Sequence, residues 1–190
     1  MTANSGGAGA PGESAIIVPV QVPVAVNRLR DRMDPSAAQG VPAHVTLIYP
    51  FMPPDQLKDD VRRAVEQIIA AEASFPFALT SVHRWPNVVY LAPEPAEPFR
   101  RLTNALAEAF PAYPPYLGAH DNVVPHLTIA QDVREDYYAA AQHALPGMLP
   151  IRDVAREAWL IGHTPEQQWH TLWRLPLGPA RPAPPLAGGG

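Results

Sequence analysis

The sequence predicts an α+β fold built mostly from antiparallel sheets. Segments with the alternation or the β-branched composition of strands are mixed along the chain with segments whose apolar residues recur at helical spacing. Short turns separate neighbouring strand segments, and such hairpins favour antiparallel sheets. The order of elements also occurs twice, because a strand containing His-x-Thr is followed in each half by a long helix and further strands.

Each element is assigned from its periodicity and from the residues that bound it. The first helix has apolar residues at Val26, Leu29 and Met33, and the Pro35 that follows Asp34 ends it. In chain order we expect a strand over 15–20, a helix over 22–33, a strand over 44–49, a long helix that begins at Asp55, strands over 75–82 and 88–91, a helix over 97–110, a strand over 122–130, a helix over 134–145, and strands over 154–162 and 169–177.

The two ends of the chain have the composition of disordered tails. Residues 1–14 are rich in Gly, Ala and Ser, residues 179–190 are rich in Pro and Gly, and neither segment has apolar periodicity. We therefore expect one folded domain over 15–178 between two disordered tails, which suits a length of 190 residues.

Composition excludes several classes of protein. The absence of Cys excludes a disulfide scaffold, a thiolate nucleophile and Cys-ligated metal. A net charge of -4 argues against binding long duplex nucleic acid, which usually requires a basic surplus. The longest apolar stretch, 15–26, is interrupted by prolines and is shorter than a membrane-spanning helix. No basic segment precedes it, which argues against a secretory signal. We expect a cytoplasmic protein without membrane contact, and a monomer.

Two segments, HVTL at 44–47 and HLTI at 126–129, share the pattern His-apolar-Thr-apolar. In a strand, residues i and i+2 project from the same face, so each segment places an imidazole beside a hydroxyl and buries its apolar residues. Seven His and seven Thr in 190 residues would give about 0.3 His-x-Thr pairs by chance, so two pairs within predicted strands indicate a site. The candidate residues are His44, Thr46, His126 and Thr128.

Two imidazoles and two hydroxyls suit displacement at phosphorus. Near neutral pH one imidazole can be neutral and accept a proton from water, while the other is protonated and gives a proton to the leaving oxygen. Thr hydroxyls can donate to the non-bridging phosphoryl oxygens. This chemistry needs no metal or other cofactor, and the remaining His lack the spacing of a zinc site. A metal held by His44, His126 and a distant carboxylate is an open alternative.

The motifs and their flanks, GVPAHVTLIYPF at 40–51 and VVPHLTIAQ at 123–131, resemble the 2H phosphoesterase superfamily in its 2′-5′ RNA ligase-like branch. The resemblance covers most of the folded region and implies two pseudo-symmetric lobes of antiparallel sheet and helices that flank a central cleft. It implies hydrolysis of cyclic phosphates, such as the 2′,3′-cyclic ends of RNA or of small nucleotides, with a 2′-phosphate as product. It further implies that His44 and His126 form the acid/base pair and that Thr46 and Thr128 clamp the phosphate.

Other readings remain open at this point. Some members of the superfamily join or cleave 2′-5′ linkages, which gives 2′-5′ RNA ligase activity as one alternative. A binding module for nucleotides or RNA ends that has lost catalysis is a second alternative. A structural protein with coincidental motifs is a third, and it predicts that the two His lie on different surfaces.

Several further side chains are candidates for substrate contacts. They include cations of the first helix, a loop Tyr and a His that precedes the second motif, namely Arg28, Arg32, Tyr116 and His120. Aromatic residues that could stack on a base are Trp85, Tyr90, Tyr113 and Tyr116. Tyr49 is an odd number of residues from His44, so we expect it to face the core.

Overall fold

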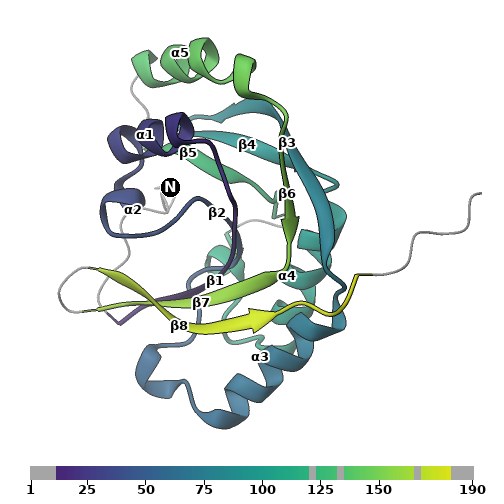
Figure 1. The fold of residues 1–190 in the computed structure, drawn as a ribbon. Coiled ribbons are helices and arrows are strands. Elements are labelled where there is room, and N and C mark those ends of the chain that lie inside the picture. The colour runs from purple at the N-terminus through teal and green to yellow at the C-terminus, as the bar shows by residue number, and fades with distance from the viewer. Residues whose placement is uncertain (1–11, 120–122, 132–134, 165–167, 181–190) are drawn as a thin grey trace, which may run out of the picture.

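The computed structural model describes residues 12–119, 123–131, 135–164 and 168–180 (Figure 1). Within these ranges, eight strands form two four-stranded antiparallel sheets with the orders β2-β1-β7-β8 and β5-β4-β3-β6. The elements are β1 (Ser14–Pro19), α1 (Val24–Met33), α2 (Pro35–Ala38), β2 (His44–Ile48), η1 (Pro54–Gln56), α3 (Asp59–Ala71), β3 (Phe75–Trp85), β4 (Val88–Glu94), α4 (Glu97–Ala109), η2 (Pro115–Gly118), β5 (Leu127–Gln131), α5 (Glu135–Ala144), η3 (Pro146–Met148), β6 (Ile151–Ala155), β7 (Glu157–His163) and β8 (Trp169–Pro176).

The two sheets are built on the same plan. In the first sheet, β1 leads through α1 and α2 to β2, which pairs antiparallel with β1 and forms the edge. In the second sheet, β4 leads through α4 to β5, which pairs antiparallel with β4 and also forms the edge. Each motif therefore lies on an edge strand that follows a crossover helix. The expected α+β class with two pseudo-symmetric lobes is confirmed.

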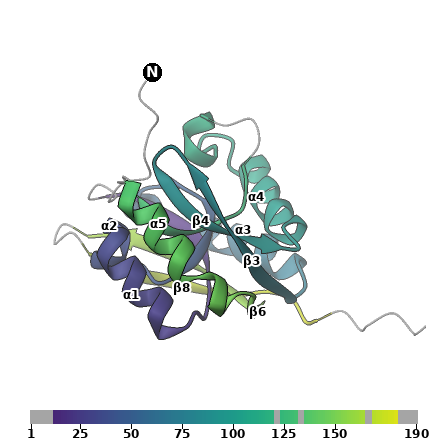
Figure 2. The ribbon, with the colours of Figure 1, turned by 90° about the horizontal axis from the view of Figure 1, so that it is seen from above.

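The two lobes exchange helices across a shared core. Helix α1 connects two strands of the first sheet but packs against β5 of the second, and helix α4 connects two strands of the second sheet but packs against β2 of the first. One hydrophobic cluster includes residues of both sheets and of both helices, with Phe99 of α4 fully buried at 0% exposure. Figure 2 shows α1 and α5 side by side on one side of the molecule and α4 on the other. The lobes are thus joined through one core.

Three sequence expectations about the elements need correction. The long helix expected to begin at Asp55 begins at Asp59, because Pro54–Gln56 form the separate short helix η1 and Leu57 after it is extended. The single strand expected over 154–162 is two strands, because the chain leaves the second sheet at Ala155, passes Arg156 and enters the first sheet at Glu157. The strand expected over 122–130 begins only at Leu127, so His126 directly precedes it. The first strand begins at Ser14, and residues 1–11 and 181–190 of the expected tails lie outside the described residues.

A search of the described residues for a membrane-spanning segment gives a negative result. None of the helices there combines the length and the apolar character that crossing a bilayer requires.

Candidate active site

The two motifs converge where the edge strands β2 and β5 lie beside each other. His44 is the first residue of β2, and His126 directly precedes β5. His44 and His126 are both half-buried, and a charge on His126 is near enough to lower the pKa of His44. The structure thus brings together the two His that 81 intervening residues separate in the sequence.

The alternation expected of the motif strands holds in both copies. The apolar motif residues are almost completely buried in the shared core, whereas the two Thr are half-buried like the two His. The core residues are Val45 and Leu47 of β2 and Leu127 and Ile129 of β5. The main core therefore holds each strand by one face, and its His and Thr are left on the other.

Both imidazoles are oriented by the same hydrogen bond. The Nδ1 atom of His44 lies 2.7 Å from the carbonyl oxygen of Pro42, and the Nδ1 atom of His126 lies 2.8 Å from that of Val124. A carbonyl oxygen only accepts, so Nδ1 carries the proton in each ring. The neutral tautomer then has its lone pair on Nε2, which is the nitrogen that can exchange protons with a ligand.

Burial favours the neutral form of both imidazoles in the free protein. It is the largest cause that lowers the pKa of His44 to about 4, and the charge of Arg30 adds to it against the opposing effects of Pro42 and Asp34. Burial likewise lowers the pKa of His126, against the hydrogen bond from Nδ1 to Val124. A phosphate anion between the rings would favour their protonated forms and so raise both pKa values.

A buried ion pair fastens the two motif segments to each other. Arg30 of α1 and Asp34 are each 2% exposed, and their charged groups are 2.7 Å apart. The Nε atom of Arg30 donates to the carbonyl oxygen of Thr128 at 3.1 Å, and its Nη2 atom donates to that of Val41 at 3.4 Å. One guanidinium therefore holds both the second motif and the loop that precedes the first. Sequence reasoning grouped Arg30 with Arg28 and Arg32 as cations that could face a phosphate and did not assign it this role, because only its four-residue spacing from Asp34 signals a pair.

Tyr116 lies at the first motif, as one of the candidate substrate contacts should. Its hydroxyl is hydrogen-bonded to that of Thr46, and burial raises the pKa of Tyr116 to about 12. The backbone N–H of Tyr116 donates to the carbonyl oxygen of Tyr49 at 2.7 Å. Tyr116 and Leu117 both have left-handed backbones, with φ of 52° and 56°. Such conformations are costly outside glycine and concentrate at functional sites.

An aromatic cluster adjoins the second motif. The ring of His126 lies 4.8 Å from the ring centroid of Trp85 and 5.4 Å from that of Tyr90, with an edge-on geometry in both cases. Tyr90 pairs with Thr128 across β4 and β5 and with His83 across β3 and β4. Directly paired residues share a face of a sheet, so these side chains lie on the same face as the second motif.

The remaining candidates are not brought to the motifs by any described contact. Arg28 and Arg32 are exposed on α1, where the Nε atom of Arg32 donates to the carbonyl oxygen of Arg28 at 3.2 Å. Tyr113 packs against Phe51 and is hydrogen-bonded to Gln56. His120 lies outside the described residues.

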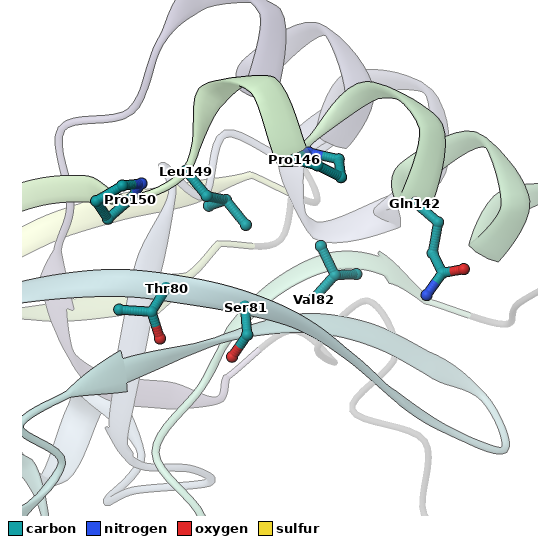
Figure 3. A pocket seen from close by; sticks show the side chains of 7 residues that line it. All are labelled: Thr80, Ser81, Val82, Gln142, Pro146, Leu149 and Pro150. Atoms are coloured by element: carbon teal, nitrogen blue, oxygen red, sulfur yellow. The ribbon is translucent and has the colours of Figure 1, made fainter.

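The structure also shows a hollow of about 510 Å³ away from the motifs (Figure 3). It lies between β3 and the segment that runs from α5 through η3 to β6, and it is lined by Thr80, Ser81, Val82, Gln142, Pro146, Leu149 and Pro150. Figure 3 shows Val82 pointing toward the helical segment and the hydroxyls of Thr80 and Ser81 pointing away from it. Its lining contains none of the four motif residues.

The described residues offer no ready metal site. Across 12–119, 123–131, 135–164 and 168–180, the side chains of His, Asp and Glu form no group of three or more that could hold a metal ion. The carboxylate that the metal alternative requires beside His44 and His126 is therefore not found in this part of the chain.

Comparison with known proteins identifies the family. The fold is that of the 2H phosphoesterases, and the profile of the 2′-5′ RNA ligase superfamily matches residues 18–164. The chain belongs to this superfamily. Two curated relatives are each named "Putative phosphoesterase". The protein from Geobacillus kaustophilus is 27% identical, over 86% of this chain and 87% of its own length. The protein from Geobacillus sp. is 32% identical, over 80% of this chain and 81% of its own length.

Solved structures of low sequence identity share the fold. Escherichia coli LigT superposes with a TM-score of 0.56 at 18% identity, over 90% of this chain and 99% of LigT. TT0787 of Thermus thermophilus superposes with a TM-score of 0.58 at 18% identity, over 89% of this chain and all of TT0787. LigT has also been solved in complex with 3′-AMP. These matches support the two-sheet architecture, and the family match supports assignment as a phosphoesterase.

Proposed function

We propose that this protein hydrolyses cyclic phosphodiesters, with 2′,3′-cyclic phosphate ends of RNA or small cyclic nucleotides as its substrates. The observation that carries the proposal is the matched geometry of His44 and His126. Each ring is fixed through Nδ1 by the carbonyl two residues before it, which leaves Nε2 of each ring outside that hydrogen bond. Two such nitrogens near one phosphorus atom could serve the attacking and the leaving oxygen.

The reaction balances with one water molecule and no further reactant. One Nε2 accepts a proton as the water oxygen forms a bond to phosphorus, and the bond from phosphorus to one ribose oxygen breaks. The other Nε2, protonated in the bound complex, gives its proton to that ribose oxygen. Breaking the bond to the 3′ oxygen leaves a 2′-phosphate, which is the product we propose.

The Thr residues and the neighbouring Tyr would bind the phosphoryl oxygens. Hydroxyls of Thr46 and Thr128 can donate to the non-bridging oxygens, where negative charge increases in the transition state. Tyr116 already shares a hydrogen bond with Thr46, so its hydroxyl is placed to contribute a third donor. LigT, which shares this fold, has been solved in complex with 3′-AMP, and this supports a nucleotide monophosphate as the kind of ligand.

The test is a panel of 2′,3′-cyclic nucleotides, RNA with a cyclic phosphate end, and 2′-5′ oligonucleotides, with products identified by mass and phosphorus NMR. We expect a 2′-monophosphate, activity that persists in EDTA, and a bell-shaped dependence of rate on pH. His44→Ala and His126→Ala should each lower kcat by about 10² to 10⁴-fold, because each removes one proton-transfer group.

Three outcomes would overturn the proposal or change it. Full activity in either His variant would remove that residue from the mechanism. Binding of nucleotides without turnover between pH 5 and 8 would identify a binding module instead. A 2′-5′ linkage formed between RNA ends would show that a ribose 5′-hydroxyl replaces water, and the physiological reaction would then be ligation.

A further inference from the structure

We propose that Trp85, backed by Tyr90, is a subsite that stacks on the nucleobase of the substrate, so that the protein selects nucleotides over other cyclic phosphates. The inference rests on the proposed function, because it assigns the base of the substrate whose phosphate would lie at His126. The cluster of Trp85, Tyr90 and His126 carries it.

The hairpin of β3 and β4 places the indole beside the second motif. Trp85 is the last residue of β3 and pairs with Val88 across the turn, so it stands at the tip of the hairpin. Tyr90 follows on β4 and pairs with Thr128 of β5. The base subsite and the phosphate-binding residues of the second motif therefore belong to adjacent strands of one rigid sheet.

The ring geometry leaves one face of the indole uncovered by this cluster. Trp85 and Tyr90 have centroids 4.1 Å apart and an interplanar angle of 31°, a separation so short that the rings must lie face to face. With His126 at 4.8 Å from Trp85 and 5.4 Å from Tyr90, the three centroid distances give an angle of about 74° at Trp85 between its two neighbours. His126 thus lies toward the edge of the indole, and the face opposite Tyr90 is occupied by neither ring.

Trp85 and Tyr90 differ in how far their rings are exposed, and this difference assigns the ligand contact to Trp85. Tyr90 is 8% exposed and also stacks with His83, at a centroid distance of 5.3 Å, so it is fixed within the sheet face. The hydroxyl of Ser81 in turn lies 2.7 Å from Nε2 of His83. Trp85 is only half-buried, so part of a large apolar ring remains available to a ligand next to the imidazole.

A nucleobase is the ligand that this arrangement fits. Every base has a flat π-face, and stacking on an aromatic side chain changes affinity by a factor of about 5 to 150. The indole offers a flat apolar surface without a charge, so it would contact the base and not the phosphate. A base stacked there would be joined through its own ribose to a phosphate within reach of His126.

The test compares two substrates that differ only in the base. These are adenosine 2′,3′-cyclic phosphate and methyl β-ribofuranoside 2′,3′-cyclic phosphate, and the readout is the ratio of their kcat/KM values. For the unmodified protein we expect a ratio of about tenfold to a hundredfold in favour of the nucleotide. Trp85→Leu should reduce the ratio to nearly one. Trp173→Leu, which changes a half-buried Trp of β8 in the other sheet, should keep the ratio.

Binding gives a second readout that does not need turnover. Titration calorimetry should show that Trp85→Leu lowers the affinity for 2′-AMP by about tenfold or more and leaves the affinity for ribose 5-phosphate nearly unchanged. Quenching of tryptophan fluorescence by 2′-AMP should be largely lost in Trp85→Phe and kept in Trp173→Phe.

Each contrary outcome has a distinct meaning. If the unmodified protein hydrolyses both substrates equally, the base subsite is wrong and the proposed function stands. If Trp85→Leu lowers both kcat/KM values by the same factor, Trp85 only supports His126 and the base subsite is again wrong. If neither substrate is hydrolysed but the selective binding of 2′-AMP disappears in Trp85→Leu, the hydrolase proposal fails and the subsite stands.

Discussion

At the scale of single residues, His44 and His126 share one hydrogen-bond arrangement but have different electrostatic surroundings. Each ring donates from Nδ1 to the carbonyl two residues earlier. Arg30, however, lowers the pKa of His44 in addition to the effect of burial, whereas burial alone is the cause that lowers the pKa of His126. The guanidinium of Arg30 therefore acts on the protonation of one imidazole, and no corresponding charge from the described residues acts on the other.

The lowered pKa of His44 predicts a loss of stability in mild acid. The pKa is about 4 in the folded protein and 6.5 in the unfolded chain, so the unfolded state binds more protons between these pH values. The free energy of unfolding is therefore unaffected by the titration of His44 above pH 6.5, and it decreases as the pH falls from 6.5 toward 4. His44→Gln should show a smaller fall in the free energy of unfolding over this range, measured by urea denaturation.

The same measurement on His143→Gln provides the control, since His143 is exposed on α5. This substitution should leave the pH dependence close to that of the unmodified protein. Equal pH dependence in His44→Gln and the unmodified protein would show that His44 titrates as in the unfolded chain.

At the scale of elements, the connection of α1 to both motifs depends on the ion pair of Arg30 and Asp34. Arg30→Met should lower the free energy of unfolding by about 3–5 kcal/mol, because it leaves the carboxylate of Asp34 buried without its cation. Arg30→Lys keeps the charge but not the planar fork and should recover part of the loss. Urea denaturation of the three proteins measures both effects.

A matched pair on α3 is the control for this prediction. Arg62 and Glu66 have the same four-residue spacing and a distance of 2.8 Å, but both side chains are exposed. Arg62→Met should change the free energy of unfolding by less than about 1 kcal/mol. Similar losses in Arg30→Met and Arg62→Met would contradict a special role for the buried pair.

The motif strands could be predicted from the sequence because their pattern is local. The alternation of HVTL and HLTI is sufficient to place His and Thr on one face and the apolar residues on the other. Tyr49 was expected in the core by extending this alternation and is found elsewhere. The pairing of β1 with β2 shifts between Ile16 and Ile17, so Leu47 and Ile48 both join the main core and Tyr49 packs on a second, smaller cluster.

Other features depend on partners that are distant in the chain. The burial of Arg30 is fixed by contacts with Val41 and Thr128, and no local pattern records them. The break of one expected strand at Arg156 likewise follows from the pairing of its two halves with different sheets. The approach of Trp85 to His126 required the register of three strands.

At the scale of the whole molecule, the exchange of α1 and α4 between the lobes predicts cooperative unfolding. Helix α1 packs on β5 and helix α4 packs on β2, so each helix covers the motif strand of the sheet to which it is not directly connected. Neither helix can detach without exposing the shared core. Native-state hydrogen exchange should therefore give the same free energy of opening for the central strands β1 and β4. A markedly lower value for one of the two strands would show that its lobe opens by itself.

The path of the chain also has a consequence for its synthesis on the ribosome. Strand β1 pairs with β2 on one side and with β7 on the other, and β3 pairs with β4 and with β6. A nascent chain that has not yet reached Ile151 therefore has β1 and β3 each with one unpaired edge, which is the feature that promotes association with other chains. The inner strands β1 and β3 gain their second partners only when residues 151–163, which form β6 and β7, have emerged.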